Sequence, residues 1–251
     1  MLVPALLGWP YARLAAELRK GFEVALHAGT ALALTIALRA EVAGVVRELD
    51  ARRALGAALA LVPTAAAGSL LERPIEARLG APWQVAIAQM VGGVALAAAD
   101  RAPATRRYED AGVLDHLVLG LAQALALVPG VSRNGATMSA ARARRLDRAA
   151  ASRLSRHAAL PVIVGASGLK GGRLLRAGLP SALRPPFAVG FAAAALSTLA
   201  ARGPLGRMAG ARSYVPLGAY RVVLGAFACA RLRRTRSRTA ASAARFASMA
   251  S

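Results

Sequence analysis

Nine residues near the middle of the chain combine a helix break with groups that bind anions. The segment is Pro129-Gly130-Val131-Ser132-Arg133-Asn134-Gly135-Ala136-Thr137. Pro and Gly end the apolar helix before it, and Ser132 is a favourable N-cap for a helix that restarts near Asn134. The unpaired N–H groups and positive dipole end of a new helix favour an anion. Arg133 adds a planar fork of donors that matches phosphate geometry, so the segment is a candidate phosphate site.

The apolar run before this break is too short to cross a bilayer. Leu114 to Val128 is almost wholly apolar, and a helix of about 15 residues is roughly 22 Å long, against a hydrocarbon core of roughly 30 Å. The break at Pro129 would therefore lie inside the membrane, where irregular backbone is tolerated only beside protein or a water-filled cavity. An arginine at that depth is costly and marks a functional site. The alternative is an ordinary loop with a surface arginine.

Composition places the chain among membrane proteins. Its 251 residues are 56% hydrophobic, and charge is sparse between long apolar blocks, which predicts an all-α, polytopic membrane helix bundle. A net charge of +21 would suggest nucleic acid in a soluble protein. Here the arginines lie mostly in short connections and in the C-terminal tail, a pattern typical of charge flanking a membrane. We therefore expect the membrane, and no nucleic acid, as a partner.

The apolar segments define the expected architecture. Beside the broken element over residues 114–149, which predicts a re-entrant helix, six segments have the length of a span: 22–40, 54–71, 83–99, 152–167, 186–201 and 214–230. We expect residues 1–230 to form a single integral membrane domain. Residues 231–251, rich in Arg, Ser and Ala, are expected to be a disordered basic tail on the cytoplasmic side.

Two local expectations follow from spacing. Arg142 lies nine positions beyond Arg133 (142 minus 133), roughly 13 Å along a helix. With Arg144, Arg145 and Arg148, it is expected to snorkel to the membrane surface as the second half of the broken element returns. Gly92-Gly93 in the third apolar segment predicts close approach of another helix.

Three further sets of polar residues interrupt apolar segments. Glu23 and His27, one helical turn apart, are either an acid/base or metal-binding pair or a hydrogen-bonded polar pair in the bundle interior. Two side chains are too few for a metal site, so the polar pair is favoured. Arg156-His157 is either a second phosphate clamp or, as we favour, a solvated turn near a loop. Arg221, inside the last apolar segment, is a candidate for polar support of the site, as are Glu23 and His27.

Taken in order, these segments resemble the undecaprenyl-diphosphate phosphatases, the bacitracin-resistance family of bacterial membrane lipid phosphatases. Residues 129–137 are similar to the family signature, in which serine is usual at the place of Asn134. Other segments resemble family helices in the same order: Phe22 to Gly29, Leu61 to Gly68, Ala151 to Gly165, and Ser213 to Arg221. The resemblance extends from Leu2 to about Ala230.

The resemblance implies a multi-pass protein of the bacterial plasma (inner) membrane. It implies hydrolysis of undecaprenyl diphosphate to undecaprenyl phosphate and inorganic phosphate, which recycles the lipid carrier for cell-wall synthesis. The expected partner is thus a polyprenyl diphosphate lipid. The family also implies assistance by a divalent cation, although the sequence contains no cluster of ligands for one and leaves any cofactor unknown. The sequence gives no oligomeric state.

Within that reaction, Arg133 is expected to bind the diphosphate and stabilise charge in the transition state. Ser132 and Thr137 would donate hydrogen bonds or orient the phosphate. Gly130, Asn134 and Gly135 would bring backbone N–H groups close to it. Ser132 as a nucleophile is disfavoured because no activating base is visible beside it in the sequence.

One departure from the family concerns the catalytic acid and base. The family has an earlier signature, a glutamate pair and a serine loop ending in a histidine, and the sequence lacks it. Leu2-Val3-Pro4 with Gly8-Trp9 resembles what directly follows that histidine, so we expect the chain to begin just after half of the active site. We expect the 251-residue chain alone to have little phosphatase activity. The alternative is a degenerate or non-catalytic homologue that binds or transports lipid phosphates; the reading frame upstream of Met1 separates the two.

Overall fold

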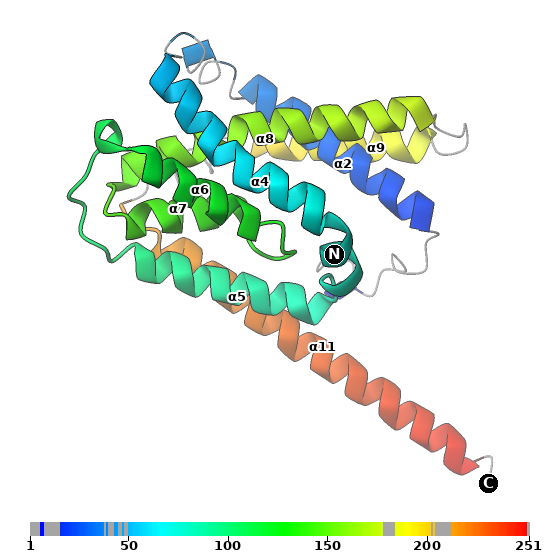
Figure 1. Ribbon diagram of the computed structural model, residues 1–251. Coiled ribbons are helices and arrows are strands. Elements are labelled where there is room, and N and C mark those ends of the chain that lie inside the picture. Colours follow the sequence, from blue (N-terminus) through cyan, green and yellow to red (C-terminus); the bar gives the residue numbers. More distant parts are fainter. Residues whose placement is uncertain are drawn as a thin grey trace.

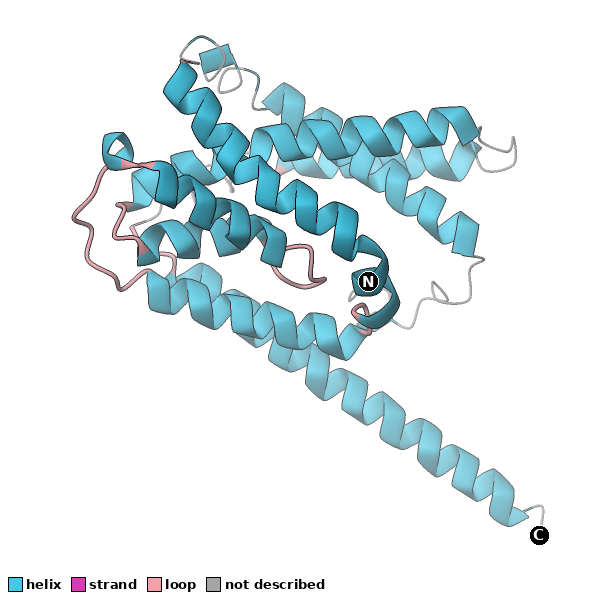
Figure 2. Cartoon of the chain, in the orientation of Figure 1, coloured by secondary structure: helices cyan, strands magenta, loops and turns pink. Residues whose placement is uncertain are grey.

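The computed structural model describes residues 6–7, 16–37, 39, 43–44, 47, 50–177, 184–201, 203 and 212–249. In this part of the chain the regular structure is helical, apart from one isolated bridge between Arg106 and Leu146 (Figures 1 and 2). The elements are α2 (Ala16–Ala37), α4 (Ala51–Arg78), α5 (Pro82–Ala99), the 3-10 turn η2 (Tyr108–Asp110), α6 (Val113–Leu125), α7 (Arg133–Ala143), α8 (Arg148–Ala177), α9 (Arg184–Ala200) and α11 (Val215–Met249). The predicted all-α class is confirmed.

Several of these helices suit a membrane by length and apolar surface. Within the described residues, Ala51–Leu71, Pro82–Ala99 and Val215–Arg234 are long and apolar enough to cross a bilayer, whereas Ala25–Ala37 and Val113–Leu125 are shorter apolar helices. Large aliphatic side chains such as Leu70, Val91 and Val223 project outward from the long helices. An outward apolar surface of this kind is the mark of a helix bundle that lies in lipid.

The broken element predicted over residues 114–149 lies at the centre of the bundle. In Figure 1, α6 and α7 form a short hairpin, with α2, α8 and α9 gathered on one side and α5 and α11 on the other. Helix α7 packs against α5, α6 and α8, while α4 covers α6. Each of the two hairpin helices, α6 and α7, is therefore packed against at least one longer helix.

Helices α5 and α11 approach closely through glycine. A Cβ added at Gly93 would lie 2.6 Å from the Gly218 carbonyl oxygen, and one added at Gly218 would lie 2.6 Å from the Gly93 carbonyl oxygen. Only hydrogen on both α-carbons permits this spacing, so the predicted close approach at Gly92-Gly93 is confirmed.

The C-terminal helix continues past the expected boundary. Helix α11 extends from Val215 to Met249 and so includes most of the basic tail. The division into a membrane domain over residues 1–230 and a disordered tail over residues 231–251 stays a prediction.

Candidate functional site

The α6–α7 hairpin enters and leaves the bundle at the same end. Helix α6 ends at Leu125 and α7 begins at Arg133, and we call the intervening turn with Arg133, residues 126–133, the tip. At the opposite end of the hairpin, Arg144 Nε donates to Asp115 Oδ1 at 2.8 Å, so the start of α6 and the end of α7 are tied together. The chain therefore makes a re-entrant excursion whose deepest point is the tip.

Gly130 shapes the tip. It has a φ of 100°, a region that side chains other than glycine rarely adopt. A Cβ at this position would also lie 2.3 Å from the Val85 carbonyl oxygen of α5. These two constraints explain the glycine within the protein itself, while its expected approach to a phosphate stays a prediction.

Ser132 is the N-cap of α7, as its sequence position predicts. Its Oγ accepts a hydrogen bond from the Gly135 N–H at 3.2 Å, and its carbonyl accepts one from the Ala136 N–H at 2.8 Å. Gly135 is buried beneath the Ser132 side chain, while Asn134 next to it is exposed. The first turn of α7 thus places its positive end at the tip.

Arg133 is half-buried on this first turn. Its Nη1 donates to the Ala159 carbonyl oxygen of α8 at 3.0 Å. In the described part of the chain no carboxylate forms an ion pair with it. Because a guanidinium carries five N–H donors, one carbonyl acceptor leaves most of its hydrogen-bonding capacity for another partner.

Thr137 lies one turn after Arg133 on α7 and is engaged by protein groups. Its side chain is only 1% exposed. The hydroxyl donates to the Arg133 carbonyl oxygen at 2.9 Å and shares a 2.6 Å hydrogen bond with Ser155 Oγ of α8. Thr137 therefore joins α7 to α8 beneath Arg133, and its expected contact with phosphate stays a prediction.

Arg221 reaches the tip from α11. Its Nη2 donates to the Gly130 carbonyl oxygen at 2.9 Å. Its Nε is buried and has no hydrogen-bond partner among the described residues. A second guanidinium thus meets the tip, and the expected role of Arg221 as polar support stays a prediction.

The Glu23/His27 pair belongs to a different part of the bundle. Helix α2, which carries both residues, packs on α9 and α8. The His27 side chain is exposed, and the side chain of Glu23 falls outside the described residues. The exposure of His27 contradicts the favoured place of this pair in the bundle interior, and a role for the pair stays a prediction.

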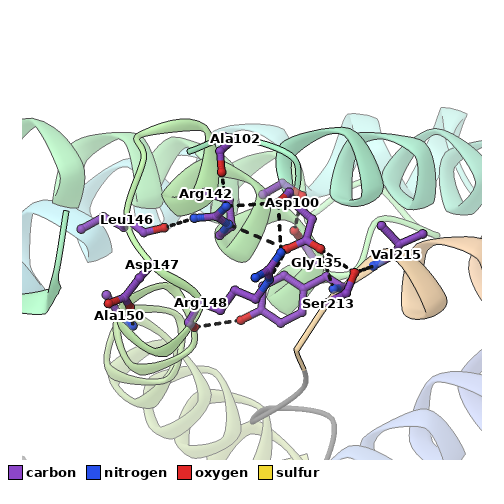
Figure 3. A network of polar contacts seen from close by, with 12 residues as sticks. Asp100, Ala102, Gly135, Arg142, Leu146, Asp147, Arg148, Ala150, Ser213 and Val215 are labelled. Atoms are coloured by element: carbon purple, nitrogen blue, oxygen red, sulfur yellow. Dashed lines mark hydrogen bonds and ion pairs between the residues drawn. The ribbon is translucent and has the colours of Figure 1, made fainter. Parts of the chain in front are cut away.

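At the opposite end of the hairpin is a polar network that the sequence analysis missed (Figure 3). We call this end the base. Asp100, just after α5, accepts from Arg148 Nε at 2.7 Å on Oδ1 and from the Tyr214 N–H and Ser213 Oγ at 2.8 Å each on Oδ2. The Tyr214 hydroxyl donates to the Arg148 carbonyl oxygen at 2.9 Å. One carboxylate thus joins the ends of α5, α8 and α11.

Arg142 completes the base and overturns an expectation. The sequence places it among arginines that snorkel to the surface, but its side chain is 1% exposed. It donates to the carbonyl oxygens of Asp100, Ala102 and Leu146, and its Nε lies 3.8 Å from Asp100 Oδ1. Burial is tolerated because carbonyl dipoles and a carboxylate surround the guanidinium.

A second carboxylate ties the start of α6 to the loop before it. Asp115 accepts from Arg106 Nη2 at 2.7 Å and Nη1 at 3.0 Å, a bidentate pair, as well as from Arg144. Its Oδ2 also accepts from the Gly112 N–H at 2.9 Å. The base therefore holds two buried carboxylates, each shared between arginines.

These contacts shift the titration of groups at the base. Burial would raise the pKa of Asp100, but hydrogen bonds from Arg148, Ser213 and Tyr214 outweigh it, so this pKa lies below its usual value. Burial, with the Asp100 charge nearby, raises the pKa of Tyr214 to about 12. Asp100 is thus held as a carboxylate and Tyr214 as a neutral hydrogen-bond donor.

Arg156 and His157 also differ from the expectation of a solvated turn. Both are half-buried on α8. Arg156 Nη1 donates to Ser152 Oγ one turn earlier, and the Tyr108 hydroxyl lies 3.1 Å from His157 Nδ1. The tertiary contact with Tyr108 is what keeps His157 from solvent.

The described side chains of the tip include no carboxylate, which is the usual protein ligand of Mg²⁺ and Ca²⁺. Among all described residues, no group of three His, Cys, Asp or Glu side chains could hold a metal ion. Assistance by a divalent cation stays an expectation from the family resemblance.

The fold and the tip together define an all-α membrane helix bundle with an arginine-bearing helical hairpin. The family model described as "Bacitracin resistance protein BacA" matches residues 1–227, and the chain belongs to this family. An undecaprenyl-diphosphatase of Geobacter sulfurreducens is 35% identical over 238 residues, covering 90% of this chain and 86% of the relative. Undecaprenyl-diphosphatases of Pelobacter propionicus and Gemmatimonas aurantiaca are each 36% identical, covering 90% and 89% of this chain and 85% of either relative.

Proposed function

We propose that the tip binds the diphosphate of undecaprenyl diphosphate and that the protein serves its hydrolysis to undecaprenyl phosphate and inorganic phosphate. This reaction regenerates undecaprenyl phosphate, the lipid carrier for cell-wall synthesis. We place the reaction at the bacterial inner membrane. The family membership and the names of the relatives support the reaction. The observation that supports the site is the environment of Arg133. This side chain is half-buried on the first turn of α7, and its described partner is a backbone carbonyl rather than a carboxylate.

The chemistry assigns the tip an electrostatic role. Water supplies the attacking oxygen, the bond between the terminal phosphorus and the bridging oxygen breaks, and the monophosphate leaves with the bridging oxygen. Negative charge spreads over the phosphoryl and bridging oxygens in this step. Fixed donors aimed at that charge, in a site shielded from bulk water, lower the barrier.

Four side chains at or beside the tip have roles in this proposal. Arg133 donates to the diphosphate, and the α7 N-terminus adds its dipole. Ser132 holds that N-terminus in place through its cap, Thr137 fixes the first turn against α8, and Arg221 holds the tip through the Gly130 carbonyl. The apolar chain of the substrate would lie along the outward aliphatic surface, which needs no specific residue.

The proton transfers are not assigned to residues of this chain. The described residues at the tip include no carboxylate or imidazole that contacts Arg133. The family resemblance implies a glutamate and a histidine for this work, and the signature that carries them is not in the 251-residue sequence. We therefore expect weak hydrolysis by this chain alone.

A hydrolysis assay tests the proposal. The chain is purified in detergent with undecaprenyl diphosphate, and released phosphate is measured beside a homologue that carries the glutamate and histidine. In that homologue, replacing the arginine aligned with Arg133 by alanine should remove most turnover while membrane insertion is unchanged. Full activity of the alanine variant would contradict the role of Arg133.

A non-catalytic lipid-phosphate binder or transporter is the second candidate, favoured by the lack of a described carboxylate or imidazole at the tip. Tight binding of the lipid without any phosphate release, in this chain and in a version extended upstream, would favour it. Robust turnover by the 251-residue chain would refute both this candidate and the expected loss of activity.

A further inference from the structure

A polar cavity lies between α4, α6, α8 and η2. It has a volume of about 370 Å³, in the range of sites that hold small ligands. Its apolar lining is formed by alanines, a leucine and a proline. Its polar lining includes Arg52, Arg53, Tyr108, His116, Arg153 and His157, and Arg133 does not line it.

Guanidiniums outnumber carboxylates in this lining. Three guanidiniums, with two imidazoles as further N–H donors, face two carboxylates, those of Asp50 and Glu109. Asp50 is occupied as the N-cap of α4, where Oδ1 accepts from the Arg53 N–H at 2.7 Å. Helices α4 and α6 both begin beside the cavity, so their positive dipole ends add to the field. The net field favours an anion.

The basic and aromatic groups are held in fixed positions. The Arg153 guanidinium lies over the Tyr108 ring, 4.1 Å from its centroid. The Tyr108 hydroxyl is 3.1 Å from His157 Nδ1, and the two rings meet edge to face with centroids 5.7 Å apart. Arg52 Nη2 donates to the Ala111 carbonyl oxygen at 3.2 Å and bridges α4 to the loop before α6. Such pre-positioned donors reduce the entropy cost of binding.

His116 lines the cavity from α6. Its ring packs against the backbone of α4, where a Cβ added at Gly56 would lie 2.6 Å from Nε2. No described residue forms a hydrogen bond with its side chain. Because the described residues contain no group of three potential metal ligands, an oxyanion suits these donors better than a cation does.

We propose that this cavity is a second anion site that takes a phosphate group, separate from the diphosphate site at the tip. Arginine forks and imidazole N–H groups bind phosphate oxygens. The apolar part of the lining admits a short hydrocarbon stem, so the phosphate comes either from solution or from a lipid head group. The proposal does not depend on the proposed hydrolysis.

The three histidines of the chain make the test selective, because His116 and His157 line the cavity and His27 on α2 does not. The full chain in detergent, with ¹⁵N-labelled histidine, is titrated with inorganic phosphate and, in a second arm, with dioctanoyl phosphatidic acid. Saturable shifts of the His116 and His157 resonances, with His27 unchanged, are expected in at least one arm. Saturation by phosphate identifies a soluble ligand, and saturation by the lipid alone identifies a head group. No shift in either arm, or parallel shifts of all three histidines, would overturn the proposal.

Variants then locate the site. Arg153→Gln should raise the dissociation constant obtained from the saturable shifts at least about tenfold. Arg101→Gln, a matched change at an exposed arginine that does not line the cavity, should leave them unchanged. Arg133→Gln should also leave them unchanged, and their loss in that variant would show that the two sites are one. The wild-type titration decides the proposal even if Arg153→Gln fails to fold.

Discussion

The base and the tip of the hairpin each hold a buried or half-buried arginine of α7, and the two differ in their partners. Arg142 at the base donates to three carbonyl oxygens and lies beside the Asp100 carboxylate. Arg133 at the tip has the Ala159 carbonyl as its described acceptor and no carboxylate. A guanidinium whose donors are used inside the protein stabilises the fold. One with spare donors in a shielded position is suited to an anionic ligand.

Arg142→Met should give the largest loss of stability. The substitution leaves three buried carbonyls without their donor and leaves Asp100 with Arg148 as its remaining described ion-pair partner. Removing one partner of a buried charged network costs about 3–5 kcal/mol. Thermal unfolding in a mild detergent measures the loss. Arg101→Met, at an exposed arginine in the same loop region, is the control and should melt like the wild type. Equal melting of Arg142→Met would show that the base is not a clamp.

Asp100→Asn should cost somewhat less, about 2–3 kcal/mol, because an amide keeps some hydrogen bonds but loses the charge that pairs with Arg148. Its effect also has a pH dependence. The folded pKa of Asp100 lies below its unfolded value of about 3.9. The stabilising contribution is therefore complete above that pH and is lost as the pH falls through the folded pKa. Melting curves should converge for wild type and variant in strong acid, and a constant difference would contradict this assignment.

Gly130→Ala should destabilise the tip by about 1–3 kcal/mol, because alanine is strained at a φ of 100° and its methyl group would meet the Val85 carbonyl. Gly68→Ala is the matched control: nothing lies within 4 Å of a Cβ added there, inside a helix. It should leave the melting temperature equal or slightly raised. If both variants melt alike, the tip has another conformation.

Arg221→Met should have a smaller effect on stability, about 1 kcal/mol. It removes the donor to the Gly130 carbonyl, but it also removes a buried Nε that lacks a described partner. Tyr220→Phe, at the exposed neighbouring residue, serves as the control in the same melting experiment. A loss as large as that of Arg142→Met would place Arg221 with the structural arginines of the base.

The parts of this fold that depend on local sequence were predictable. Apolar blocks and the Pro129-Gly130 break predicted the helix positions, and Ser132 was identified as an N-cap because capping needs only the next few residues. The base was not predictable, because Asp100 meets Arg148 and Tyr214, which are 48 and 114 positions away. Arg142 was assigned to the surface for the same reason: its burial depends on carbonyls that only the tertiary fold brings to it.

The most direct test of the account is the affinity for a short polyprenyl diphosphate, farnesyl diphosphate, measured by calorimetry in detergent for wild type and Arg133→Gln. The account predicts at least about a tenfold loss of affinity with a melting temperature close to that of the wild type, since only one described hydrogen bond is lost. Unchanged affinity, or a loss of stability as large as that of Arg142→Met, would contradict the claim that Arg133 is kept for a ligand.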